Sequence, residues 1–162
     1  MYVLTLTIVH TLVSFVAIGA GMAVVAELLK GDPRGGGLAK LFLGTALFTS
    51  ASGFAFPFTQ FLPSHGTGIV ALLVLLPTLL ARYHFHLRGA WRLVHAGGLV
   101  ASLYFLFFVL VAQIFSKIPA LREAAPTLAE PPFTITQGIL LMVFIGLGIA
   151  VTRKLRGNAS FA

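Results

Sequence analysis

Residues 91–115 read WRLVHAGGLVASLYFLFFVLVAQIF, and this stretch decides the class of the protein. Its one charged residue, Arg92, lies next to its beginning, and most of the others are Leu, Val, Phe, Ala or Gly. A helix of this length extends roughly 37 Å at about 1.5 Å per residue. The hydrocarbon core of a bilayer is about 30 Å thick. The stretch therefore predicts a transmembrane helix.

The composition of the whole chain agrees with this interpretation. Apolar residues make up 58% of the 162 residues, charged residues make up 9%, and the mean hydropathy is +1.00. A soluble domain carries about 25% charged residues, because its surface faces water. The sequence thus predicts an all-α, polytopic membrane protein, organised as a single transmembrane domain of residues 1–162.

Five apolar stretches predict a bundle of about five transmembrane helices of roughly 20 residues each. Pro57 and Pro77 are expected to bend the second and third helices, and Ser64 is expected to cap the third. Residues 116–132 hold four prolines and are predicted to form an outer loop, and a short, frayed tail is expected from Arg153 onward. The predicted helices are residues 3–29, 38–60, 66–83, 91–115 and 133–152.

The basic residues predict the orientation of this bundle. If the five helices alternate in direction, nine of the 11 Lys and Arg residues fall at one end, and only Lys117 and Arg122 fall at the other. Cytoplasmic loops are enriched in Lys and Arg, so the N-terminus is predicted to lie outside and the C-terminus in the cytoplasm. Residues 1–29 contain no Lys or Arg, unlike a signal peptide. Because no organelle signal is evident, a bacterial inner membrane is the expected location.

Four polar side chains are predicted to gather near the outer face, where burial in lipid is costly without a partner. We interpret them as a ligand-binding pocket that opens outward, with Thr49, Ser50 and Ser52 of the second helix lying deeper. The alternative is that these side chains form hydrogen bonds between helices. The four are His10, His65, Gln113 and Gln137.

A second polar layer is predicted near the cytoplasmic face. It holds Glu27, His84, His86, Arg92 and His95. His84, Arg88, Trp91 and His95 would follow one helical face, provided that Gly89 does not break the helix. Glu27 is expected to pair with Arg92 or Lys30. The alternative is a belt of amphipathic side chains at the level of the lipid headgroups.

The five histidines also suggest a haem or metal site. His10 with His65, and His95 with His84 or His86, would form two axial pairs for b-type haems stacked across the bilayer, which suits transmembrane electron transfer. The chain has no cysteine, so thiolate ligands and disulfides are excluded. The residues leave the identity of any metal open.

No motif points to a reaction. The sequence has no Gly-rich phosphate loop, no His-Glu-x-x-His and no nucleophile elbow. Ser14 and His10 are the one local pair of nucleophile and base at helical spacing. Because this spacing is the only support for the pair, we interpret it as a coincidence.

The sequence therefore favours a non-catalytic accessory subunit or a small-ligand-binding membrane protein, and leaves open whether the chain is an enzyme. The alternatives are the b-type haem protein, and a transporter or membrane enzyme for a lipophilic substrate such as a quinone. The expected partners are bilayer lipids and a larger membrane complex or further copies of the chain. The net charge of +7 is explained by residues that flank membrane helices rather than by nucleic-acid binding.

Overall fold

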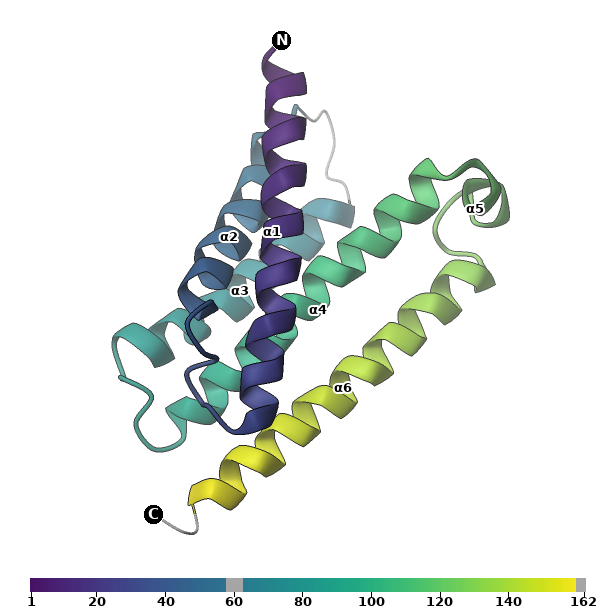
Figure 1. Ribbon diagram of the computed structural model, residues 1–162. Helices are drawn as coiled ribbons and strands as arrows, with labels where there is room; N and C mark the ends of the chain where they lie inside the picture. The colour runs from purple at the N-terminus through teal and green to yellow at the C-terminus, as the bar shows by residue number, and fades with distance from the viewer. Residues whose placement is uncertain (58–62, 160–162) are drawn as a thin grey trace.

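The computed structural model describes residues 1–57 and 63–159, which form helices joined by turns and contain no strand (Figure 1). This confirms the prediction of an all-helical protein. The helices are α1 (Tyr2–Lys30), α2 (Ala39–Ser52), the short 3₁₀ helix η1 (Gly53–Ala55), α3 (Pro63–Tyr83), α4 (Trp91–Lys117), α5 (Pro119–Ala124) and α6 (Pro131–Ala159).

Four of the described helices are long and apolar enough to cross a membrane. They are α1, α3, α4 and α6, and each contains an 18-residue window with a mean hydropathy of at least 1.8. An apolar helix that exposes large Leu, Ile, Phe and Val side chains all along its length belongs in lipid rather than in water. The length and composition of these four helices are compatible with the predicted polytopic membrane protein.

The second predicted helix, residues 38–60, is shorter than expected. α2 ends at Ser52, tightens into η1, and gives way to extended backbone at Phe56, with φ −70° and ψ 139°. Pro57 explains the change, because a proline disfavours helical backbone at the residue before it. The proline thus ends the helix where a bend was predicted. Residues 58–60 of this prediction lie outside the described residues.

Other boundaries differ by a few residues, for identifiable reasons. α3 begins at Pro63 and runs on through Pro77, so Ser64 lies inside the helix and the prediction that it caps this helix is wrong. The outer loop contains α5, which starts at a proline, the residue best suited to a first helical turn. α6 continues to Ala159, so a frayed tail from Arg153 is wrong for the described residues. Residues 160–162 lie outside them.

The helices run up and down between two ends of the bundle. α1 and α2 are antiparallel neighbours, since His10 contacts Ser52 near one end and Glu27 lies against Gly36 near the other. α3 runs in the same direction as α1, because its last turn meets the loop after α1, where Arg82 donates a hydrogen bond to the Arg34 carbonyl. α4 then returns, and α6 follows it back, so the two termini lie at opposite ends (Figure 1).

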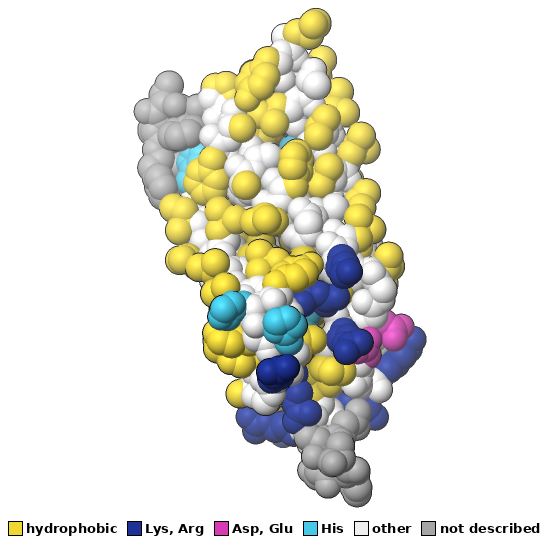
Figure 2. Space-filling model, turned by 90° about the vertical axis from the view of Figure 1, so that its left-hand side faces the viewer, with side chains coloured by type: hydrophobic (Ala, Val, Ile, Leu, Met, Phe, Trp, Pro, Cys, Tyr) yellow, Lys and Arg dark blue, Asp and Glu magenta, His cyan; other side chains and the backbone are white. Residues whose placement is uncertain are grey.

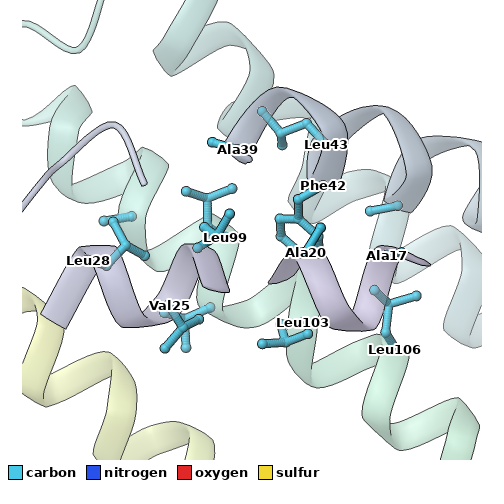
Figure 3. Close-up of a cluster of buried hydrophobic side chains, with 14 of the residues drawn as sticks. Ala17, Ala20, Val25, Leu28, Ala39, Phe42, Leu43, Leu99, Leu103 and Leu106 are labelled. Atoms are coloured by element: carbon cyan, nitrogen blue, oxygen red, sulfur yellow. The ribbon is translucent and has the colours of Figure 1, made fainter. Parts of the chain in front are cut away.

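The core lies where α1, α2 and α4 meet. Figure 3 shows this cluster of buried side chains, which includes Ala17 and Ala20 of α1, Phe42 of α2 and Leu103 of α4. Lipid is as apolar as these side chains, so close packing rather than exclusion from water holds the helices together. Small residues allow it: a Cβ added at Gly21 would lie 2.6 Å from Leu103 and 2.8 Å from Phe42. Ala17, Ala20 and Gly21 therefore lie at a helix contact, while Gly19 is exposed.

Candidate functional site

Polar side chains join α1 to α2 in the half of the bundle that contains the N-terminus. His10 Nδ1 lies 2.9 Å from Ser52 Oγ. One turn further along α1, the Ser14 hydroxyl donates to the His10 carbonyl at 2.7 Å and lies 3.5 Å from Thr49 Oγ1. These contacts use the small polar residues of α2 as partners for α1. Hydrogen bonds between helices were the alternative to a ligand-binding pocket for these polar residues.

Two phenylalanines just after α2 contact His10 and His65. The ring of His10 meets that of Phe56 edge-on, with centroids 5.4 Å apart, and the ring of His65 lies 5.7 Å from that of Phe54. His65 is buried. The break after Ser52 is what turns these phenylalanines toward α1 and α3. The short segment after α2 thus places one Phe against His10 and another against His65.

The two glutamines of the predicted outer pocket belong to other helices. Gln137 on α6 is buried, and its Nε2 donates to the Phe108 carbonyl of α4 at 3.0 Å. Gln113 lies on an exposed part of α4. The contacts described here therefore place His10 between α1 and α2, and Gln137 between α4 and α6.

His95 is fully buried near the opposite end and is held on both ring nitrogens. Nδ1 lies 3.1 Å from the Thr78 carbonyl, and Nε2 lies 3.3 Å from Arg82 Nη1. The guanidinium can only donate, so Nε2 must accept from it and Nδ1 must carry the proton that goes to Thr78. Arg82 Nη1 also donates to the Arg34 carbonyl at 2.8 Å. His95 and Arg82 together tie α4, α3 and the loop after α1.

His84 and His86 lie in the turn between α3 and α4. His86, Leu87 and Gly89 all have positive φ, so residues 84–90 are not helical. The predicted helical face shared by His84, Arg88, Trp91 and His95 is therefore wrong. The rings of Phe85 and Trp91 instead stack in parallel with their centroids 3.7 Å apart, and His84 meets Phe85 edge-on at 4.7 Å.

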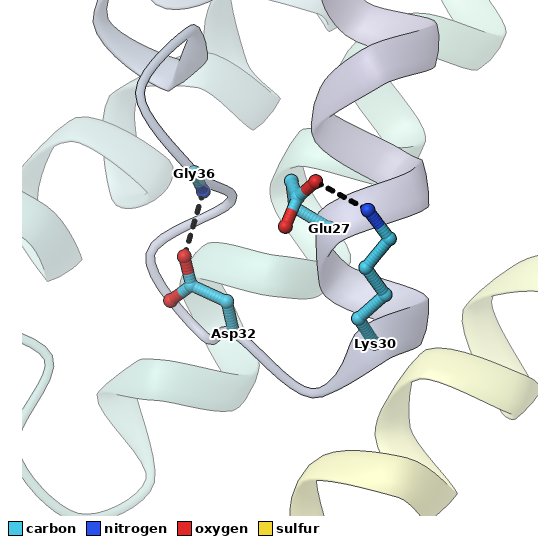
Figure 4. Close-up of polar contacts among 4 residues, drawn as sticks. All are labelled: Glu27, Lys30, Asp32 and Gly36. Carbon is cyan, nitrogen blue, oxygen red and sulfur yellow. Dashed lines mark hydrogen bonds and ion pairs between the residues drawn. The ribbon is translucent and has the colours of Figure 1, made fainter.

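The two acidic side chains at this end are satisfied within the chain (Figure 4). Glu27 pairs with Lys30 at 2.8 Å, which is one of its two predicted partners. Asp32 accepts the backbone N–H groups of Arg34 and Gly36, each at 2.9 Å, and so closes the glycine-rich loop. A hollow of about 300 Å³ opens beside this loop, and its one charged lining side chain is Glu27.

The charges of the protein are divided unequally between its two ends. Lys and Arg side chains gather at the end where α1, α3 and α6 finish, below a surface that is mostly apolar (Figure 2). This basic end also holds Glu27 and Asp32, while Glu123 and Glu130 balance Lys117 and Arg122 at the other end. The basic end thus carries the whole net charge of +7. Its cations are Lys30, Arg34, Lys40, Arg82, Arg88, Arg92, Arg153, Lys154 and Arg156.

The arrangement assembles no cluster of metal ligands among residues 1–57 and 63–159. In that part of the chain no three His, Asp or Glu side chains come together as metal ligands. Ser14 donates to the backbone of His10 and not to its ring, so the pair does not form a nucleophile and base. His10, His95 and Gln137 instead form hydrogen bonds with neighbouring helices.

Sequence reasoning missed Thr78, Arg82 and Gly98. A Cβ added at Gly98 would overlap the Thr78 hydroxyl, so α3 and α4 touch backbone to side chain there. The Gly97-Gly98 pair is a signal that could have indicated a close helix contact, because small residues let helix backbones approach each other, but it does not identify the partner. Nothing in the sequence indicated that Arg82 would turn back onto His95.

Comparison of the chain with protein-family models, curated proteins and solved structures finds no match.

Proposed function

We propose that this chain is a small, non-catalytic membrane subunit that crosses a bacterial inner membrane five times and acts within a larger membrane complex. Its N-terminus lies outside and its C-terminus lies in the cytoplasm. The observation that carries the proposal is that His10, His95 and Gln137 each bond to another helix of the same chain. Such bonds stabilise the packing of the helices, which supports a structural role for these side chains.

The directions of the helices support five crossings. α1 and α3 both run toward the basic end, so the chain must return between them. α2 and η1 make that return over 17 residues, 14 of them in α2. At about 1.5 Å per α-helical residue and about 2.0 Å per 3₁₀ residue they rise roughly 27 Å, close to the hydrocarbon thickness of about 30 Å.

The charge distribution supports the orientation. Lys and Arg close to membrane helices are retained on the cytoplasmic side. In this bundle they flank the end of α1, the start of α2, both sides of the turn at 84–90 and the end of α6. The end that carries Tyr2 and α5 then lies outside.

Native electrophoresis of membranes from the protein's own host tests the role as a subunit. The membranes are solubilised in a mild detergent, and the chain is followed through a tag at its C-terminus. The proposal expects a band far above the 17.2 kDa of the chain, with other polypeptides in fixed ratio. A His10→Gln variant, whose amide can still bond to Ser52, should assemble equally well. Migration as a monomer would contradict the proposal.

One observation favours a second candidate, a small-ligand site at the outer end. His10 with Phe56, and His65 with Phe54, combine a hydrogen-bonding ring with an apolar ring at the break after α2. Such pairs suit a lipophilic ligand with polar groups, such as a quinone. A short-chain ubiquinone is the probe: it should raise the unfolding temperature of the wild type but not of His10→Phe. An equal rise in both proteins, or none in either, would exclude the site.

A further inference from the structure

The cations of the basic end have too few acidic partners within the chain. Glu27 is paired with Lys30, and both oxygens of Asp32 accept backbone N–H groups of their own loop. Among the described residues that line the hollow beside that loop, Glu27 is the one acidic side chain. Lys40, Arg88, Arg153 and Lys154 are exposed at this end. The excess charge must therefore be neutralised by anions from outside the chain.

The turn between α3 and α4 presents part of this charge on a fixed scaffold. The backbone of Leu87 donates to the Ala81 carbonyl, and that of Arg88 donates to the Phe85 carbonyl. Phe85 and Trp91 stack across the turn with an interplanar angle of 3°. Arg88 lies between the two stacked residues in sequence, and Arg92 follows directly after them.

Aromatic rings and cations at one level of a membrane protein match the chemistry of the headgroup region. Trp and Tyr settle where hydrocarbon meets water, and Lys and Arg near that level attract anionic lipids. The guanidinium group is planar and can bind phosphate through two N–H donors at once. Tyr83, at the end of α3, extends the aromatic level, with the Arg82 guanidinium 6.0 Å above its ring.

We propose that Arg88 and Arg92, with the stacked rings of Phe85 and Trp91, form a binding surface for the phosphate of anionic phospholipid headgroups, which we call the headgroup surface. The ligand is a lipid of the bilayer rather than a free phosphate, because the surface lies at the end of two membrane helices, α3 and α4. The inference needs only insertion in a membrane. It does not depend on the role as a subunit or on which side the basic end faces.

Trp91 is the only tryptophan of the chain, so its fluorescence reports on this surface alone. The protein is placed in nanodiscs that contain phosphatidylglycerol and phosphatidylcholine in equal amounts. In one sample only the phosphatidylglycerol is brominated, and in the other only the phosphatidylcholine. The total lipid charge is the same in both, so unequal quenching measures selective contact with one headgroup class.

The proposal expects stronger quenching of Trp91 by brominated phosphatidylglycerol. Arg88→Gln with Arg92→Gln should lower the relative association constant of anionic over neutral lipid by at least about fivefold, as expected for cations near a membrane surface. The matched control removes two cations from the opposite end, Lys117→Gln with Arg122→Gln, and should leave the selectivity unchanged. Millimolar inorganic phosphate should not change the fluorescence of the wild type, which separates lipid from free phosphate.

Equal quenching by the two brominated lipids in the wild type would overturn the proposal, as would an equal loss of selectivity in the control variant. If the double variant does not fold, the selectivity of the wild type is measured at rising concentrations of sodium chloride instead. A relative association constant of anionic over neutral lipid that falls toward one supports the headgroup surface, since salt screens such contacts. Selectivity that salt leaves unchanged contradicts it.

Discussion

His95 on α4 binds the backbone of α3 at Thr78, with 3.1 Å between its Nδ1 and the Thr78 carbonyl oxygen, and accepts a hydrogen bond from Arg82 on its other nitrogen. Because Arg82 also reaches the Arg34 carbonyl, one buried ring and one guanidinium join three segments at the basic end. The histidine that sequence patterns suggested as a metal or haem ligand is therefore occupied by the protein itself.

Replacing His95 should weaken the contact between α3 and α4. His95→Phe keeps an aromatic ring at this position but removes the acceptor for the Arg82 donor, so the free energy of unfolding should fall by about 1–2 kcal/mol. Equilibrium unfolding in mixed micelles measures the change. His84→Phe, in the exposed turn, is the matched control and should change the stability little. Equal effects of the two substitutions would refute the role of the buried contact.

The visible spectrum tests the same contact from another side. With both nitrogens of His95 engaged, an iron atom could bind this residue only after the contacts with Thr78 and Arg82 had broken. Adding haem to the purified protein should therefore give spectra that are the same for the wild type and His95→Phe. A Soret band in the wild type that is lost in His95→Phe would show that His95 is an axial ligand.

Gly98 should not tolerate a larger residue. A Cβ at this position would overlap the Thr78 hydroxyl and lie 2.9 Å from Thr78 Cβ, so Gly98→Ala should reduce the free energy of unfolding by about 1–3 kcal/mol, as overpacking does. Thr78→Ala removes the hydroxyl and the methyl group of Thr78 but keeps its Cβ, so the double variant should recover part of the loss. Gly97→Ala meets no atom within 4 Å and serves as the control. Equal losses at positions 97 and 98 would contradict the described packing.

The start of α6 should respond to acid through Glu130. The Thr127 hydroxyl donates to the Glu130 carboxylate at 2.8 Å, and the backbone N–H groups of Thr127 and Ala129 add to it. These bonds hold the pKa of Glu130 below its ordinary value of 4.5. The folded-state pKa is lowered, so the stabilisation of this turn is complete above the ordinary value and is lost as the pH falls through the lowered pKa.

Thr127→Val should raise the pKa of Glu130 toward its ordinary value. Titration of carboxyl-labelled glutamate by NMR follows the change, with Thr136→Val as the control, because Thr136 bonds only to the Pro132 carbonyl. An unchanged pKa in Thr127→Val would mean that the hydroxyl does not contribute.

The sequence was sufficient to predict the class of the protein and the positions of α1, α3, α4 and α6. Long apolar stretches leave few alternatives once a bilayer is the solvent. The length of α2 was harder to predict, because apolar residues continue past Ser52 and the effect of Pro57 on Phe56 decides where helix ends. A connection at 84–90 was predicted, because it lies between the expected helices 66–83 and 91–115, but its backbone conformation was not, since positive φ at His86 and Leu87 is unusual for such residues.

The candidate site could be predicted only as a set of residues. Depth along a helix follows from counting, so the outer level of His10 and the inner level of His95 could be inferred. Which helices are neighbours does not follow from counting, and the partners Ser52, Thr78 and Phe108 were therefore not foreseen. Hydrogen bonds between helices depend on rotation as well as depth, and one sequence carries little information about rotation.

Labelling of single cysteines tests the central claim, that the chain crosses the membrane with its basic end in the cytoplasm. The natural chain has no cysteine, so each substitution gives one reactive site. Ala90 and Ala124 are both exposed; Ala90 directly precedes α4, and Ala124 is the last residue of α5, which follows the other end of α4. With a membrane-impermeant maleimide on intact cells, Ala124→Cys should react at once and Ala90→Cys only after the cells are opened. Rapid reaction of Ala90→Cys in intact cells, or equal reaction of both, would contradict the account.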